Sequence, residues 1–82
     1  MPVPKDLLKL ITKGFDDLMM VAFDNGLACF EDLEKLKKIV SEENLMQIEA
    51  GLKSLMHSEN SPKLNAKAER VLTLIKTAIT CA

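Results

Sequence analysis

Apolar residues recur at spacings of three and four in four successive segments, which is the period of an α-helix with one buried face. The segments cover residues 4–24, 29–40, 42–56 and 62–79. The polar joins between them are only about three to five residues long, so consecutive helices must fold back antiparallel. The sequence therefore predicts an all-α fold, an antiparallel up-and-down bundle of four helices.

The length of the chain limits how many cores it can build. Eighty-two residues cover one core and not two, so a single helical domain is expected over residues 1–82. The residues are 48% hydrophobic and 28% charged, which is a globular composition. Because a core of this size contributes little net stability, small domains are commonly supplemented by oligomerisation.

Start and stop signals mark the predicted helix ends. Gly26 suits the left-handed residue beyond the first helix, with Leu27 folding back onto it. Ser41 is predicted to cap the start of the third helix. Ser61 and Pro62 form a strong start signal for the fourth helix, as its cap and its first residue.

Two alternatives concern the first half of the chain. Gly14 lies in the middle of the first segment, and a break there would produce five helices. Asn25-Gly26 between apolar flanks is also a β-turn signal, so a hairpin over residues 18–30 is the rival structure. Neither flank alternates apolar with polar residues, and this favours the helix.

Residues 18–23 are six apolar residues in a row. Successive residues of a helix diverge by about 100°, so the six cannot all face one core. Three continue the buried stripe, whereas Met20, Val21 and Phe23 are predicted to face elsewhere. Each helix of a four-helix bundle keeps one face in solvent, so we expect a partner to cover them, most simply a second copy. Coverage by neighbouring helices of the same chain is the alternative.

The predicted partner-binding residues follow from this surplus of apolar surface. They are Met20, Val21, Phe23 and Leu27, with Met46 as a second choice because it lies outside its own apolar stripe. Methionine is flexible and is over-used on surfaces that bind partner helices. The sequence favours a non-enzymatic, homodimeric protein-binding module that acts as a regulator, adaptor or chaperone-like binder through helix-in-groove contacts.

Enzymatic chemistry has little support in the sequence. His57 is the only histidine, adjacent acids diverge on a helix, and no nucleotide or metal motif is present. We therefore predict no catalytic residue, no cofactor and no metal site. Cys29 and Cys81 show no metal or redox spacing and are expected to be reduced, which favours a cytoplasmic location.

Two further hypotheses depend on lysines. Lys5, Lys9 and Lys13 edge the first helix and could bind an anionic membrane surface. A nucleic-acid regulator would combine them with three lysines of the second segment, Lys35, Lys37 and Lys38. A net charge of −1, a single arginine and the absence of Trp and Tyr disfavour nucleic acid. No apolar run is long enough for a membrane-spanning helix.

Overall fold

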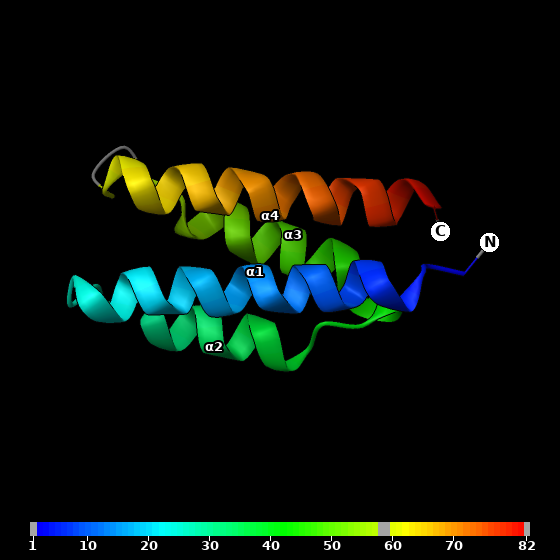
Figure 1. The fold of residues 1–82 in the computed structure, drawn as a ribbon, viewed down its shortest axis with the longest axis horizontal. Coiled ribbons are helices and arrows are strands. Elements are labelled where there is room, and N and C mark those ends of the chain that lie inside the picture. Colours follow the sequence, from blue (N-terminus) through cyan, green and yellow to red (C-terminus); the bar gives the residue numbers. More distant parts are fainter. Residues whose placement is uncertain (1, 58–59, 82) are drawn as a thin grey trace.

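The computed structural model describes residues 2–57 and 60–81, and it confirms the all-α bundle (Figure 1). The described residues contain helices and turns but no strand. The elements are α1 (Lys5–Asp24), α2 (Phe30–Lys38), the short 3₁₀ helix η1 (Glu42–Asn44), α3 (Leu45–Leu55) and α4 (Pro62–Cys81).

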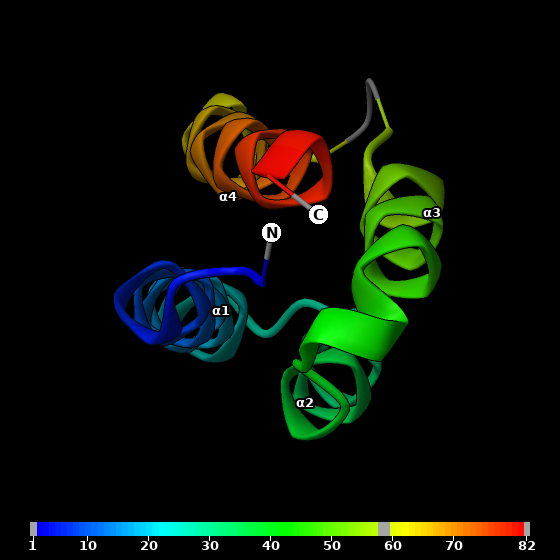
Figure 2. The same ribbon diagram turned by 90° about the vertical axis from the view of Figure 1, so that its right-hand side faces the viewer.

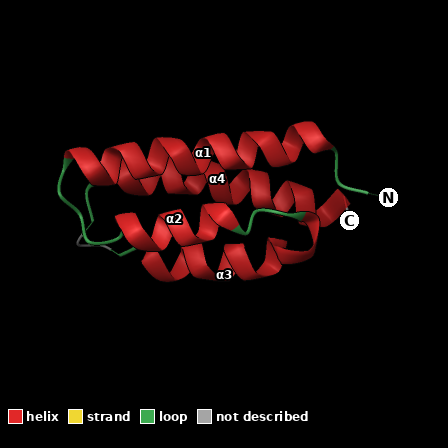
Figure 3. Ribbon diagram, turned by 90° about the horizontal axis from the view of Figure 1, so that it is seen from below, coloured by secondary structure: helices red, strands yellow, loops and turns green. Residues whose placement is uncertain are grey.

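The four α-helices run up and down around one core. Each helix reverses the direction of the one before it, so the two ends of the chain lie at the same end of the bundle (Figure 1). Seen end-on, α1, α2, α3 and α4 follow one another around the core (Figure 2). The long helices α1 and α4 lie side by side, and α2 and α3 complete the bundle (Figure 3). Each helix therefore has two neighbours and one outward face.

The core is built from one face of every helix. Helix α2 supplies only one buried side chain, Leu33, whereas α4 supplies six and α1 five. Because burial of apolar surface is the main stabilising contribution, α1 and α4 anchor the fold. The buried residues are Val3, Ile11, Phe15, Leu18, Val21, Ala22, Leu33, Leu45, Ile48, Leu52, Leu64, Ala68, Val71, Leu72, Ile75 and Ala78.

Helix α1 continues through Gly14, so the five-helix alternative is wrong. A Cβ atom at Gly14 would lie 2.6 Å from Cγ2 of Val71 on α4. The absence of a side chain therefore lets α1 and α4 approach closely at this level. The packing of the two longest helices offsets the roughly 1 kcal/mol that glycine costs inside a helix.

The hairpin alternative for residues 18–30 is also wrong, because the chain ends α1 with a Schellman turn. Gly26 has a φ of +62°, and the amide of Leu27 donates to the carbonyl of Ala22 at 2.8 Å. The amide of Gly26 donates to Phe23 at 3.1 Å. These two bonds satisfy carbonyls at the helix end and turn the chain toward α2, with Leu27 packed against the core as predicted.

The predicted start of α4 is confirmed, and that of α3 is not. The hydroxyl of Ser61 accepts a hydrogen bond from the amide of Leu64 at 3.1 Å, and Pro62 is the first helical residue. Ser41 does not cap α3, because η1 lies between them. The hydroxyl of Ser41 donates a hydrogen bond to the carbonyl of Ile39 instead. The third helix consequently begins at Leu45, later than the sequence indicates.

Candidate protein-interaction surface

Two of the predicted contact residues, Met20 and Phe23, lie exposed on the outer face of α1. Met20 is 66% and Phe23 72% exposed, although both are large apolar side chains. They are one helical turn apart, so their side chains are neighbours on the same face. The apolar run at residues 18–23 therefore leaves two of its side chains exposed to solvent.

The prediction that Val21 faces away from the core is wrong. Its side chain is only 6% exposed and belongs to the core. The reason is that α1 packs against both α2 and α4. Because neighbouring helices cover α1 on two sides, a wider part of its circumference is buried. This buried part includes Val21 together with Leu18 and Ala22. Val21 is therefore a core residue and not a contact residue.

The exposed pair continues into the start of α2. The ring of Phe23 lies against that of Phe30, with centroids 5.9 Å apart and planes tilted by 57°. Such tilted pairs are a favourable aromatic geometry. Leu27, half-buried, lies in the turn between them. We call Met20, Phe23, Leu27 and Phe30 the apolar patch. The sequence did not predict Phe30 as a contact residue, because the periodicity of its segment indicates only that Phe30 flanks the buried stripe.

Met46 is exposed but does not join the apolar patch. It is 73% exposed in the first turn of α3. Helix α3 begins at the end of the bundle where α1 also begins, whereas Met20 and Phe23 lie toward the end of α1 (Figure 1). The structure therefore separates Met46 from the other predicted contact residues by most of the length of the bundle.

A second exposed apolar site, missed in the sequence, lies between α1 and α4. Leu10 is 51% exposed and lines a groove of about 470 Å³ with Leu74 of α4. The sequence signal was available, because Leu10 is the one leucine of the first segment outside its apolar stripe. Three cationic side chains and one acid also line this groove: Lys13, Lys67, Arg70 and Asp17.

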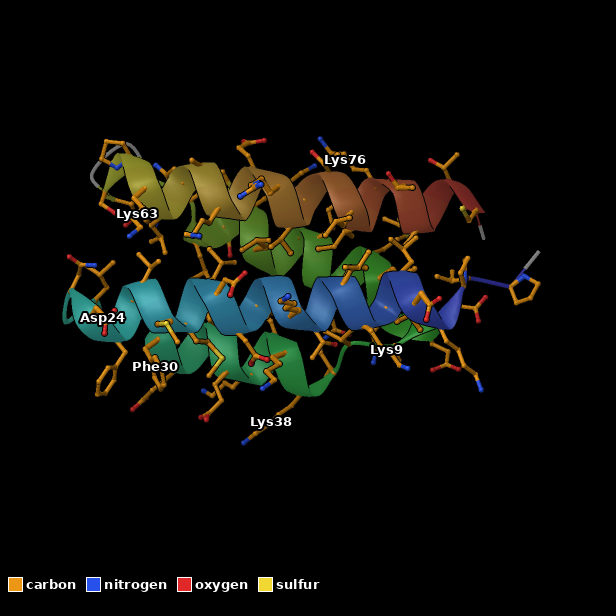
Figure 4. All side chains as sticks on the ribbon, viewed as in Figure 1. Lys9, Asp24, Phe30, Lys38, Lys63 and Lys76 are labelled. Carbon is orange, nitrogen blue, oxygen red and sulfur yellow. The ribbon has the colours of Figure 1, made fainter. Side chains whose placement is uncertain are left out.

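The lysines singled out in the sequence fall on different parts of the surface. Lys5, Lys9 and Lys13 are all exposed along α1. Lys37 of α2, by contrast, makes an ion pair with Asp16 of α1. The side chains of Lys9 and Lys38 project from the surface of α1 and α2 (Figure 4).

The two cysteines and the histidine lie on different elements, with Cys29 before α2, His57 after α3 and Cys81 at the end of α4. Cys29 is half-buried, and this burial raises the pKa of its thiol. Cys81 is exposed at the end of α4, and both thiols are free. His57 lies exposed beyond α3, where its carbonyl accepts a hydrogen bond from the Asn65 side chain at 2.9 Å. Within residues 2–57 and 60–81, no group of three acidic, histidine or cysteine side chains could hold a metal ion.

Comparison of the chain with protein-family models, with curated proteins and with solved structures found no match. None of the helices in the described residues has both the length and the apolar character to cross a membrane. The surface chemistry of the bundle is therefore the basis for a functional assignment.

Proposed function

We propose that the protein is a non-enzymatic protein–protein interaction module and that the apolar patch is its contact surface. The observation that carries this proposal is the adjacent exposure of Met20 and Phe23, at 66% and 72%. Single exposed apolar residues are ordinary on protein surfaces, whereas contiguous ones mark interaction sites. The tilted pairing of Phe23 with Phe30 extends the patch across two helices.

The size of the patch indicates a reversible contact. Full burial of a methionine or phenylalanine side chain is worth about 1.5–3 kcal/mol. Covering the exposed parts of Met20 and Phe23 then contributes roughly 2–4 kcal/mol per copy. Association itself costs on the order of 4–15 kcal/mol, so further contacts are required. The patch alone therefore supports only weak, reversible association, at micromolar affinity (about −8 kcal/mol) or weaker, which suits a regulator or adaptor.

A second copy of the chain is the first partner to test. Sedimentation equilibrium from about 10 μM to 1 mM covers the expected affinity range. The double variant Met20→Ser/Phe23→Ser should shift the chain toward monomer, and circular dichroism should show unchanged helix content. Met46→Ser is the matched control, since Met46 is equally exposed and lies away from the patch. A native chain that stays monomeric over the whole range would contradict self-association.

Binding to an anionic membrane surface is a second candidate, favoured by the exposure of Lys5, Lys9 and Lys13 along α1. Vesicles with anionic lipid should then retain the chain at low salt and release it as salt screens the charges. Vesicles of neutral lipid serve as the control. Retention that is insensitive to salt, or absent at low salt, would count against this candidate.

A further inference from the structure

We infer that a second copy of the chain docks antiparallel along α1, over its groove with α4, in one particular register. This inference rests on the proposed function and specifies the partner and the contact. It starts from a row of exposed residues at alternating spacings of four and three, which places them in one line along the outer face of the helix. The row, called here the α1 seam, consists of Asp6, Leu10, Lys13, Asp17, Met20 and Asp24.

The α1 seam is complementary to itself when one copy is reversed. Leu10 and Met20 lie five residues to either side of Phe15, and Lys13 and Asp17 lie two residues to either side. A two-fold axis level with Phe15 therefore sets Leu10 opposite Met20 of the second copy. The same axis sets Lys13 opposite Asp17 of the second copy. Because a two-fold contact is reciprocal, each apolar and each charged pairing occurs twice.

Helix α4 completes the receiving surface. Gly14 packs on Val71, and the two helices are antiparallel, so Leu74 falls near Leu10 and Arg70 near Lys13. These four side chains line the groove, which runs between α4 and α1 on the face seen in Figure 4. Met20 of the second copy would thus contact the side chains of Leu10 and Leu74. Asp17 of the second copy would lie close to the positive charges of Lys13 and Arg70.

The distribution of charge along α1 selects the antiparallel arrangement. The exposed lysines of this helix, Lys5, Lys9 and Lys13, precede Gly14, whereas three of its four acids, Asp16, Asp17 and Asp24, follow it and one, Asp6, precedes it. When the second copy is antiparallel, the basic half of α1 before Gly14 faces the acidic half after Gly14 of the other copy. When the second copy is parallel, each half faces the half of like charge. In the reversed copy the two outermost seam residues, both aspartates, meet at the exposed ends, where solvent screens them.

Charge reversal at the inner pair tests this register. Lys13→Asp sets carboxylates opposite one another, and Asp17→Lys sets ammonium groups opposite one another, so each variant should self-associate about tenfold or more weakly. An equimolar mixture of the two variants should associate again, because every inner pair in the mixed dimer is then oppositely charged. The double variant Lys13→Asp/Asp17→Lys should also recover. Sedimentation equilibrium measures all four samples.

Two matched controls accompany these variants. Lys76→Asp makes the same charge change on the side of α4 away from α1, where Figure 4 shows Lys76, and should leave association unchanged. Met46 is as exposed as Met20 but lies outside the α1 seam and the apolar patch, so Met46→Ser should also leave association unchanged, whereas Met20→Ser should weaken it.

The outcomes separate the inference from the proposed function. A dimer that is indifferent to Lys13 and Asp17, or a mixture that stays monomeric, overturns the antiparallel register and leaves the apolar patch as the contact. A native chain that never dimerises overturns the inference and self-association, and leaves contact with a different protein as the proposed function of the apolar patch. Recovery in the mixture and the double variant, with both controls unchanged, establishes the register.

Discussion

Gly14 of α1 lies directly against Val71 of α4, so close that a methyl group at Gly14 would sit 2.6 Å from Cγ2 of Val71. This contact positions the two longest helices and the groove beside them. Valine is stiff at χ1 and cannot turn aside easily. Gly14→Ala should therefore lower the free energy of unfolding by about 1–3 kcal/mol, although alanine is the better helix former. Urea denaturation measures this change.

A matched glycine provides the control for Gly14→Ala. A Cβ atom at Gly51 of α3 would lie 2.7 Å from Cδ2 of Leu36, the far end of a flexible side chain. Leu36 can move, so Gly51→Ala should be neutral or should stabilise by up to about 1 kcal/mol through helix propensity. The Gly14→Ala penalty should also shrink in a Val71→Ala background. Equal penalties at both glycines, or in both backgrounds, would contradict the close-contact explanation.

The turn after α1 depends on the left-handed conformation of Gly26, whose φ is +62°. No heavy atom lies near the position of a Cβ at this residue, so strain in the backbone is the main cost of a side chain. Gly26→Ala should destabilise the fold by about 1–2 kcal/mol. Gly26→Asn should cost less, because asparagine tolerates this conformation. Thermal melting followed by circular dichroism distinguishes the two variants.

Ser61 and Ser41 make a second matched pair. The Ser61 hydroxyl caps α4 through the amide of Leu64, so Ser61→Ala should cost about 0.5–2 kcal/mol of stability. The Ser41 hydroxyl caps no helix, and Ser41→Ala should cost less than Ser61→Ala. Denaturation of both variants under one condition provides the comparison. A larger loss at Ser41 would show that its bond to Ile39 matters more than the helix cap.

Burial should make Cys29 a slow nucleophile. The pKa of its thiol is raised chiefly by burial, so at a given pH less of the reactive thiolate is present than for an ordinary thiol. Alkylation near neutral pH should label Cys81 first, since this thiol is exposed. In the unfolded chain the thiol of Cys29 ionises at lower pH, so its contribution to stability declines as pH rises through the ordinary thiol range. Peptide mapping by mass spectrometry follows both thiols, and a faster Cys29 would contradict this reasoning.

Local sequence determined the helices and several of their ends. Helical periodicity and short joins predicted four antiparallel helices, and the signals at Gly26 and Ser61 identified a stop and a start correctly. Each of these features depends on residues close together in the chain, because capping and turn bonds span only a few positions. The sequence failed at Ser41, where the short helix η1 intervenes before α3.

Only the tertiary structure decided which apolar side chains stay in solvent. Periodicity places a side chain at an angle around its own helix axis, but the width of the buried arc depends on how many neighbours the helix has. Helix α1 has neighbours on two sides, so Val21 is buried while Met20 and Phe23 remain exposed. The pairing of Phe23 with Phe30, and the groove that joins Leu10 to Leu74, arise between different helices. Such relationships are set by how helices pack, and packing depends on contacts between residues far apart in the chain.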